Sequence, residues 1–517
     1  MTTIATPNID KVNKMREKKL SELEDYVFLS DRNTQTNYVV ERDGRIWLSD
    51  AFPLPYFERA ETKIVLNWRD YIPGQVRWNW RKDYLPVLEI LDNENLLELT
   101  ADEGELLLRY NEDECFSYPG RQKIDNERFA RMIEGKDAFW KSFFSSGWQP
   151  PENPLFPDAA WRACFVQAMH SFCGSHPKYG VGYYNRNYHD GFPPTIISMV
   201  NALLDYHHPD IALDYLGYYF DRFVLADGSI DYYGPALSEY GMLLDLSGKI
   251  IRLPEGRAWL ENYYVAFHRI ARYLYRIRNP FVYGTDRRYR LLAGVPEADT
   301  RDAPAVYVHN NAWVWRGLIS WRNIAANLGR IEDAEEAKRE ACDLKIMLDK
   351  AISENLMPDG LIPARLDRLD TIHSFTDSRD CAYANNRYYL ELLHSGFLSR
   401  DDENKLIEAR ESRDGELAGM TYFHFAAAWG DLPTAPYCCN NWPIASYGAA
   451  LARLGEKARL ERVIKGHLHY HLTHDTFTAY ENVDAQVEGV RRAFTDWCVP
   501  AQLAYPRMLK WYVEMPG

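Results

Sequence analysis

The feature that most constrains the fold is a long succession of helical segments between Asp158 and residue 513. Their apolar residues recur at intervals of three and four, as in FHRIARYLYRI and WRNIAANL, which is the spacing of an amphipathic α-helix. Each such helix must bury its apolar stripe against a neighbour. The predicted helices span residues 158–173, 195–207, 209–224, 235–247, 257–277, 308–328, 331–353, 379–394, 401–412, 442–454, 457–472 and 494–513.

Turn residues between these segments predict that each helix folds back on the one before it. Gly329 and Gly455 each follow a helical segment, at the position where the backbone turns left-handed. Gly396 ends another segment, and Ser399 with Asp402 forms a capping box for the next. Consecutive antiparallel hairpins bury every apolar face if six of them close into a ring with one helix of each on the inside. We therefore predict a mainly α fold, an (α/α)6 toroid, with an open helical solenoid as the alternative.

The first part of the chain has a different character. Residues 1–24 have the mixed charges of a short helix, and β-like runs follow over Tyr38–Tyr110. The stretch LLELTADEGELLLRY has the pattern of a β-hairpin with its turn at Asp102–Gly104. A proline-rich segment, QPPENPLFP, then separates this part from the helices. We predict an N-terminal helix and a small β-containing unit in residues 1–150, and an (α/α)6-barrel catalytic domain in residues 151–517.

Charge and motif content exclude several functions. The chain has 60 Lys and Arg against 74 Asp and Glu, a net charge of −14, which disfavours a nucleic acid or an anionic membrane as partner. It has no apolar run long enough to span a bilayer and no apolar segment after its N-terminal charges, so we expect a cytoplasmic protein. The eight cysteines form no CxxC pair, and nucleotide-binding glycine motifs and HExxH are absent. We therefore expect no metal and no cofactor, and a homo-oligomer stays compatible with the sequence.

Aromatic residues are unusually frequent. The chain contains 15 Trp, 35 Tyr and 22 Phe, together 14% of its residues. Rings with a polar tip suit surfaces that are half apolar and half wet, such as a cleft in which a sugar ring stacks while its hydroxyl groups are hydrogen-bonded. The composition indicates a small-molecule carbohydrate as substrate, with an aromatic-rich core as the alternative explanation.

Three stretches resemble the six-hairpin glycosidase superfamily of (α/α)6-barrel enzymes, which includes trehalase-like, processing α-glucosidase-like and glycogen-debranching-like members. Residues 188–233, which begin YHDGFPP, are similar to the opening hairpin with its D-G-x-P entrance. Residues 296–344, which begin PEADTRDAP, are similar to the acidic loop and helix pair that carry the general acid. Residues 436–486, which end in YENVDAQ, are similar to the late hairpin and Glu-Asn segment that carry the general base. The Pro-Gly-Gly-Arg-Phe and Gln-Trp-Asp-x-Pro signatures of trehalases are absent, so no single family is assigned.

This resemblance implies a glycoside hydrolase that cleaves a small glycoside or oligosaccharide with a carboxylic acid and a carboxylate, with inversion. Asp299 matches the general acid, Glu297 is the second choice, and Glu481 matches the general base. The alternative is that these side chains are solvated loop carboxylates. The expected substrate-binding residues are polar and aromatic side chains on the same rim: His189, Asp190, Tyr233, Glu239, His309, Asn310, Trp313, Asn441, Trp442 and Tyr480.

Other activities use the same helical architecture. A polysaccharide or oligosaccharide lyase would remove a proton from a uronate, and His309 with Asn310 and Asn311 has suitable groups. A sugar epimerase would use paired histidines, with His424 and His373 as candidates. A non-catalytic helical scaffold that binds a partner through its aromatic rim is a third alternative.

Overall fold

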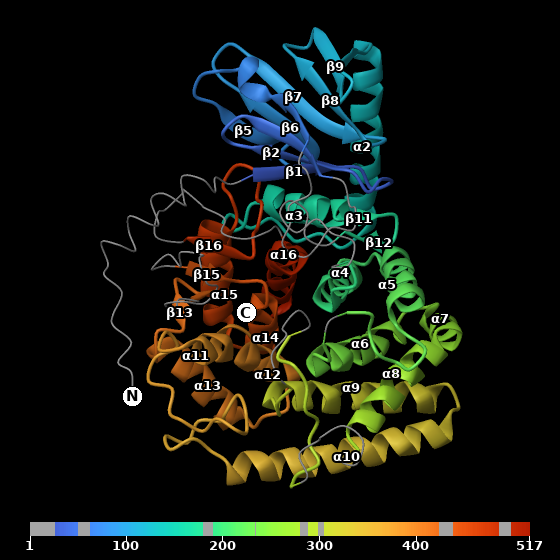
Figure 1. The fold of residues 1–517 in the computed structure, drawn as a ribbon, viewed down its shortest axis with the longest axis vertical. Coiled ribbons are helices and arrows are strands. Elements are labelled where there is room, and N and C mark those ends of the chain that lie inside the picture. The colour runs from blue at the N-terminus through green and yellow to red at the C-terminus, as the bar shows by residue number, and fades with distance from the viewer. Residues whose placement is uncertain are drawn as a thin grey trace.

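The computed structural model describes residues 26–49, 63–178, 190–232, 234–279, 288–297, 304–422, 438–484 and 498–516. Two antiparallel sheets lie at one end of the molecule, and a ring of helices forms the rest (Figure 1). The helix expected in residues 1–24 lies outside the described residues. In the part of the chain that is described, no helix combines the length and the apolar character needed to cross a membrane.

The N-terminal sheets are larger than the sequence suggested. One has four strands in the order β1-β2-β3-β4, and the other has six in the order β10-β9-β8-β7-β6-β5. The predicted hairpin is present, and Glu103 and Gly104 in its turn have φ of 48° and 82°, as a tight turn between twisted strands requires. The strands are β1 (Tyr26–Ser30), β2 (Asn37–Glu41), β3 (Arg45–Ser49), β4 (Lys63–Asn67), β5 (Arg77–Arg81), β6 (Leu85–Leu91), β7 (Leu96–Asp102), β8 (Glu105–Tyr110), β9 (Glu114–Tyr118) and β10 (Gln122–Lys123).

An additional helix, α2 (Asn126–Ser146), follows the sheets and was not predicted. It begins at the N-cap Asp125, whose side chain accepts a hydrogen bond from the backbone N–H of Glu127. Its buried residues include Phe129, Trp140 and Phe143, and it contacts β6, β8 and β9. The helix therefore covers the six-stranded sheet.

The remaining helices alternate between an outer and an inner ring, which confirms the predicted (α/α)6 toroid. Inner helices contact one another in the order α4, α6, α9, α12, α14 and α16, and α16 packs on α4 to close the ring. The outer helices are α3 (Asp158–His170), α5 (Pro209–Phe223), α7 (Gly256–Asn262) with α8 (Tyr264–Ile277), α10 (Ile331–Glu354), α13 (Arg400–Ser412) and α15 (Lys457–Gly466). The inner helices are α4 (Pro193–Asp205), α6 (Leu237–Ile250), α9 (Val308–Asn327), α11 (Arg379–Tyr383) with α12 (Tyr389–Ser395), α14 (Ile444–Leu454) and α16 (Val499–Glu514).

Two glycines allow the backbones of α6 and α9 to touch. A Cβ atom on Gly241 would lie 2.2 Å from the carbonyl oxygen of Trp313, and one on Gly317 would lie 2.5 Å from the carbonyl oxygen of Gly241. Any larger residue at either position would separate the two helices. This crossing fixes α6 and α9, and both helices carry residues of the candidate site at their N-terminal ends.

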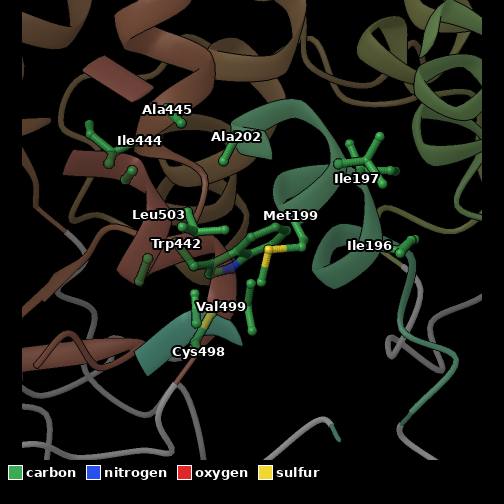
Figure 2. Packing of buried hydrophobic residues seen from close by; sticks show 14 of the residues in the cluster. Ile196, Ile197, Met199, Ala202, Trp442, Ile444, Ala445, Cys498, Val499 and Leu503 are labelled. Atoms are coloured by element: carbon green, nitrogen blue, oxygen red, sulfur yellow. The ribbon is translucent and has the colours of Figure 1, made fainter. Parts of the chain in front are cut away.

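The ring closes around Trp442. Figure 2 shows its indole with Met199 of α4 and with Val499 and Leu503 of α16, all buried. The hydroxyl group of Tyr206 also donates a hydrogen bond of 2.8 Å to the carbonyl oxygen of Pro506, which joins the end of α4 to α16. Apolar burial and a buried hydrogen bond thus join the first and last inner helices.

Candidate active site

The segments that lead from each outer helix to the next inner helix meet at one end of the ring, at the N-termini of the inner helices. Asp190 precedes α4, Glu239 lies in the first turn of α6, and Glu297 lies in the segment before α9. Trp442 precedes α14, and Glu481 precedes α16. The alternation of outer and inner helices therefore brings side chains from distant parts of the sequence to one mouth of the toroid.

Arg387 is the centre of this site. Its guanidinium group is fully buried and lies 2.6 Å from Glu239, 3.1 Å from Glu297 and 2.9 Å from Glu391. It also lies 4.7 Å above the ring of Trp442, in a cation–π contact. Arg387 belongs to a π-helical turn, Ala384–Tyr388, between α11 and α12, a departure from regular helix that is frequent at functional sites.

The carboxyl groups around Arg387 outnumber their cation. Glu239 is 1% exposed, and burial raises its pKa to about 7 even though Arg387 opposes the shift. Burial also raises the pKa of Glu391. Three full negative charges on one guanidinium would leave uncompensated charge in a buried place. The cluster therefore retains protons near neutral pH.

Glu481 lies beside this cluster on a short ribbon. The strands β15 (Cys438–Asn440) and β16 (Asn482–Asp484) pair antiparallel and bring Asn440 next to Glu481. The Asn440 side-chain amide donates to Glu481 Oε1 at 3.4 Å. Burial raises the pKa of Glu481 to about 7, and the negative charge of Glu297 adds to the shift. Glu481 and Glu297 thus lie close enough to interact, but Arg387 contacts only Glu297.

The N-terminal sheets support the segment that carries Glu481. Tyr480, fully buried, accepts a hydrogen bond of 3.1 Å from the backbone N–H of Tyr26 and donates one to its carbonyl oxygen. The indole N–H of Trp80 donates to the carbonyl oxygen of Thr476 at 2.8 Å. Strands β1 and β5 therefore hold the chain just before Glu481.

Two predicted binding residues, Asn310 and Asn441, are fully buried and hydrogen-bonded to the backbone. Asn310 accepts a hydrogen bond of 2.9 Å from the N–H of Ser238 and donates one of 3.0 Å to the carbonyl oxygen of Val295. It thereby joins the N-terminus of α6 to the segment that carries Glu297. Asn441 accepts a hydrogen bond of 2.9 Å from the N–H of Thr421.

His309 and Trp313 are buried on α9, and Trp313 lines the cavity inside the ring. The His309 ring stacks on Tyr388 at a centroid distance of 4.8 Å and an interplanar angle of 6°. Burial lowers its pKa well below the ordinary value, so the ring is neutral. The indole N–H of Trp313 donates to the carbonyl oxygen of Glu391 at 2.8 Å. Both rings hold neighbouring helices in place.

Asp190 and Trp442 lie at the entrance to α4 and α14. The carboxylate of Asp190 is 2.8 Å from Nε2 of His176 and is almost fully buried. Phe192 lies 6.0 Å from the ring of Trp442. The indole of Trp442 is 8% exposed, so the Arg387 contact and the apolar packing cover most of it.

Several candidates cannot be placed. Asp299, His189, Tyr233 and His424 lie outside the described residues. His373 is described and is exposed on the segment before α11. Among the residues with described positions, no group of three or more His, Cys, Asp or Glu side chains is arranged to hold a metal ion.

Neither protein-family models nor curated proteins match this sequence. Among solved structures, a bacterial glucoamylase in complex with acarbose superposes with a TM-score of 0.58 at 10% identity, covering 95% of this chain and 94% of that chain. The chain has the six-hairpin fold. Two further solved structures are similar. One is a glycosidase, with a TM-score of 0.47 at 14% identity, covering 69% of this chain and 97% of that chain. The other is an unsaturated glucuronyl hydrolase specific for heparin, with a TM-score of 0.41 at 11% identity, covering 68% of this chain and 94% of that chain. The glucoamylase confirms the six-hairpin resemblance at the level of the fold.

Sequence reasoning missed Arg387 as a site residue. The segment ANNRYYLELL carries a lone arginine directly before an aromatic and apolar run, with Glu391 four residues later. A charged residue in such a context needs a buried partner, and this signal could have marked Arg387 as part of an ionic cluster. The partners Glu239 and Glu297 come from distant segments and could not be paired with it from the sequence.

Proposed function

We propose that this protein is a glycoside hydrolase that acts on a small glycoside or oligosaccharide, with Glu297 and Glu481 as its pair of carboxyl groups. The observation that carries the proposal is that two neighbouring carboxyl groups at the mouth of the toroid have opposite environments. Arg387 contacts Glu297, whereas an amide contacts Glu481 and burial raises its pKa to about 7. Glycoside hydrolysis needs one protonated and one ionised carboxyl group on either side of the scissile bond.

In this proposal Glu481 donates the proton and Glu297 activates the water. Arg387 places a cation 3.1 Å from Glu297, whereas Glu481 has no basic partner among the described residues and burial raises its pKa to about 7. Glu481 therefore protonates the leaving-group oxygen, while Glu297 removes a proton from the water that attacks the anomeric carbon, with inversion. These roles reverse those implied by the resemblance for Glu481, and Asp299 stays a predicted alternative acid.

The bound acarbose in the glucoamylase supports a carbohydrate as the substrate class. In this chain, Trp442 lines the cavity inside the ring beside Arg387 and would contact the sugar, while Asp190 is buried against His176. The buried position of His309 weakens the lyase alternative, because a base that removes a proton from a uronate must reach the substrate.

The first experiment is a turnover screen on neutral and uronate-containing oligosaccharides, in which reducing ends and unsaturated-uronate absorbance are measured together. We expect reducing ends without new absorbance for wild type, and at least a hundredfold loss in Glu297→Gln and Glu481→Gln. Glu332→Gln, an exposed carboxylate at the start of α10, is the control and should keep full activity. New absorbance would show a lyase, and a changed sugar without cleavage would show an epimerase; either result contradicts the proposal.

Substrates with different leaving groups distinguish the roles of the two carboxyl groups. A glycoside with a dinitrophenyl leaving group needs no proton, so Glu481→Gln should keep most of the wild-type rate on it while losing activity on natural linkages. Glu297→Gln should remain slow on both substrates and should be rescued by azide, which replaces the activated water. The opposite pattern would assign the acid to Glu297, and loss only in Asp299→Asn would move the acid to that residue.

A further inference from the structure

The cavity inside the ring extends from the candidate active site to the opposite ends of the inner helices. A cavity of about 260 Å³ follows the inside of α6 from Glu239 in its first turn to Lys249 in its last turn. Arg387 and Glu391 form its wall at the mouth end, while Arg453 and Trp511 line the other end. Its mouth end therefore belongs to the candidate active site, where Trp442 also lines it, whereas its far end lies at the opposite ends of the inner helices.

Basic side chains gather at the far end of this cavity, and two of them are fully engaged. Arg316 donates to Asp245 and to the carbonyl oxygen of His394, at 3.1 and 2.7 Å. Arg453 pairs with Glu403 and donates to the carbonyl oxygen of Leu393 at 2.8 Å. A cation at the C-terminal end of a helix is stabilised by the helix dipole and by the last carbonyl groups. These two arginines therefore need no ligand.

Arg507 is different, because it is buried without a comparable partner. It lies on α16 and is 6% exposed. Its nearest carboxylate oxygen, on Asp205, is 3.7 Å from Nε, beyond hydrogen-bond distance, and among the described residues Nε has no hydrogen-bond partner. The ring of Trp511 lies against the guanidinium at 5.0 Å. A buried guanidinium with unused donors is costly unless another group accepts its hydrogen bonds.

Charge around Arg507 also favours an anion. Lys249 Nζ lies 3.2 Å from the other oxygen of Asp205, so a single carboxylate faces two cations. Burial lowers the pKa of Arg507, and Asp205 opposes this shift. Both cations line the cavity, and their unused donors are available to an oxygen-rich group within it.

We propose that the far end of this cavity binds a small molecule through a phosphate or carboxylate group, which Arg507 and Lys249 hold. The planar fork of a guanidinium suits two oxygens of such a group, and an ammonium adds a third donor. Apolar side chains, including Ile197, Ala449 and Trp511, line the same cavity and would cover the carbon skeleton of the ligand. A cavity of about 260 Å³ can accommodate a ligand of monosaccharide size. The far end shares its cavity with the candidate active site, but Arg507 and Lys249 have no part in the proposed hydrolysis.

The test is calorimetric titration of the full chain with three probes at constant ionic strength: inorganic phosphate, acetate and glucose 6-phosphate. We expect saturable binding of at least one probe. Comparison of phosphate with acetate shows whether the site prefers a phosphate or a carboxylate group. Arg507→Gln should weaken this binding at least tenfold, and Lys249→Gln, at a half-exposed position, should weaken it severalfold. Arg272→Gln removes the same charge from an exposed pair with Glu336 and should bind like wild type.

Three results would overturn the proposal: no saturable binding of any probe to wild type, equal binding to Arg507→Gln, or equal weakening in the Arg272→Gln control. If Arg507→Gln does not fold, Lys249→Gln decides, because unchanged affinity in that variant contradicts the site. Activity on oligosaccharides is not a readout here, so a failure of the hydrolase proposal leaves this test unaffected.

Discussion

The phenol of Tyr480 is bonded to both the backbone N–H and the carbonyl oxygen of Tyr26, and their rings meet edge to face at 5.2 Å. This contact joins the first strand of the N-terminal sheet to the residue directly before Glu481. Arg42 and Asp475, 2.6 Å apart, add a second connection between the same two parts of the chain. The sheets are therefore part of the support of the proposed catalytic site.

Tyr480→Phe removes both hydrogen bonds while keeping the ring. We expect kcat to fall about tenfold with little change in KM, because a small displacement of a reacting group affects the chemical step more than ground-state binding. Steady-state kinetics on the substrate identified by the screen measures this split. Tyr71→Phe, which loses a contact with Tyr118 inside the sheets, is the control and should stay close to wild type. An unchanged kcat in Tyr480→Phe would show that the sheets do not position Glu481.

Glu481→Gln should stabilise the protein at alkaline pH. The folded-state pKa of Glu481 is raised from 4.5 to about 7, so the folded protein holds a proton that the unfolded chain has released between these values. Its contribution to stability therefore falls as pH rises from about 4.5 to about 7, by at most about 3 kcal/mol. A neutral glutamine does not incur this cost. We expect a higher Tm than wild type at pH 8 and an equal Tm at pH 4.5, measured by calorimetry; an equal difference at both pH values would contradict the shifted pKa.

Arg387→Lys should be strongly destabilising. A lysine cannot contact Glu239, Glu297 and Glu391 with the geometry of a guanidinium, so buried carboxylates lose their partner. We expect a loss of about 3–5 kcal/mol in the free energy of unfolding, measured in urea at pH 8. The loss should shrink at pH 5, where Glu239, whose pKa is raised to about 7, is protonated. Arg272→Lys, in an exposed pair, should cost less than about 1 kcal/mol.

Gly241→Ala should disrupt the ring at the α6–α9 crossing. The added methyl group would lie 2.2 Å from the carbonyl oxygen of Trp313, a contact that requires the helices to separate. We expect a Tm lowered by several degrees or a loss of folded protein. Gly135→Ala is the matched control: it lies in helix α2, nothing lies within 4 Å of its added methyl group, and alanine is the better helix former, so its Tm should rise slightly. Equal effects in both variants would mean that the crossing tolerates expansion.

Local patterns predicted most of the helical ring. Gly396 and Gly455 have φ of 66° and 78° at helix ends, as their positions in the sequence indicated, and Ser399 caps α13 as predicted. Helix caps and C-terminal glycines depend only on residues a few positions away, so they can be predicted from a single sequence. The candidates Glu297 and Glu481 came from the resemblance to the six-hairpin superfamily and not from these local patterns. Helix α2 was not predicted. Residues 126–146 lie between strand-like runs and a proline-rich segment, and these two features favoured a β-containing unit up to residue 150.

Long-range contacts could not be read from the sequence. Arg387 meets Glu297 and Glu239 across sequence separations of 90 and 148 residues, and no local pattern encodes such pairs. The same holds for Asn310 and Asn441, whose amide groups suggested sugar binding but whose hydrogen bonds go to buried backbone groups. The sequence identified Glu239, Glu297, Asn310 and Asn441 but not Arg387, and only the tertiary structure shows that the two amides bind the backbone.

The hydrogen bond between Tyr206 and Pro506 spans 300 residues, and α4 has no other inner neighbour on that side until α16 arrives. During synthesis, most of the chain must therefore emerge from the ribosome while the apolar face of α4 still faces water. Elongation at about 5–20 residues per second makes this an exposure of many seconds. This face of α4 stays open to water until α16 is made, and we expect the yield in a cell to respond to translation speed as well as to the stability of the finished ring.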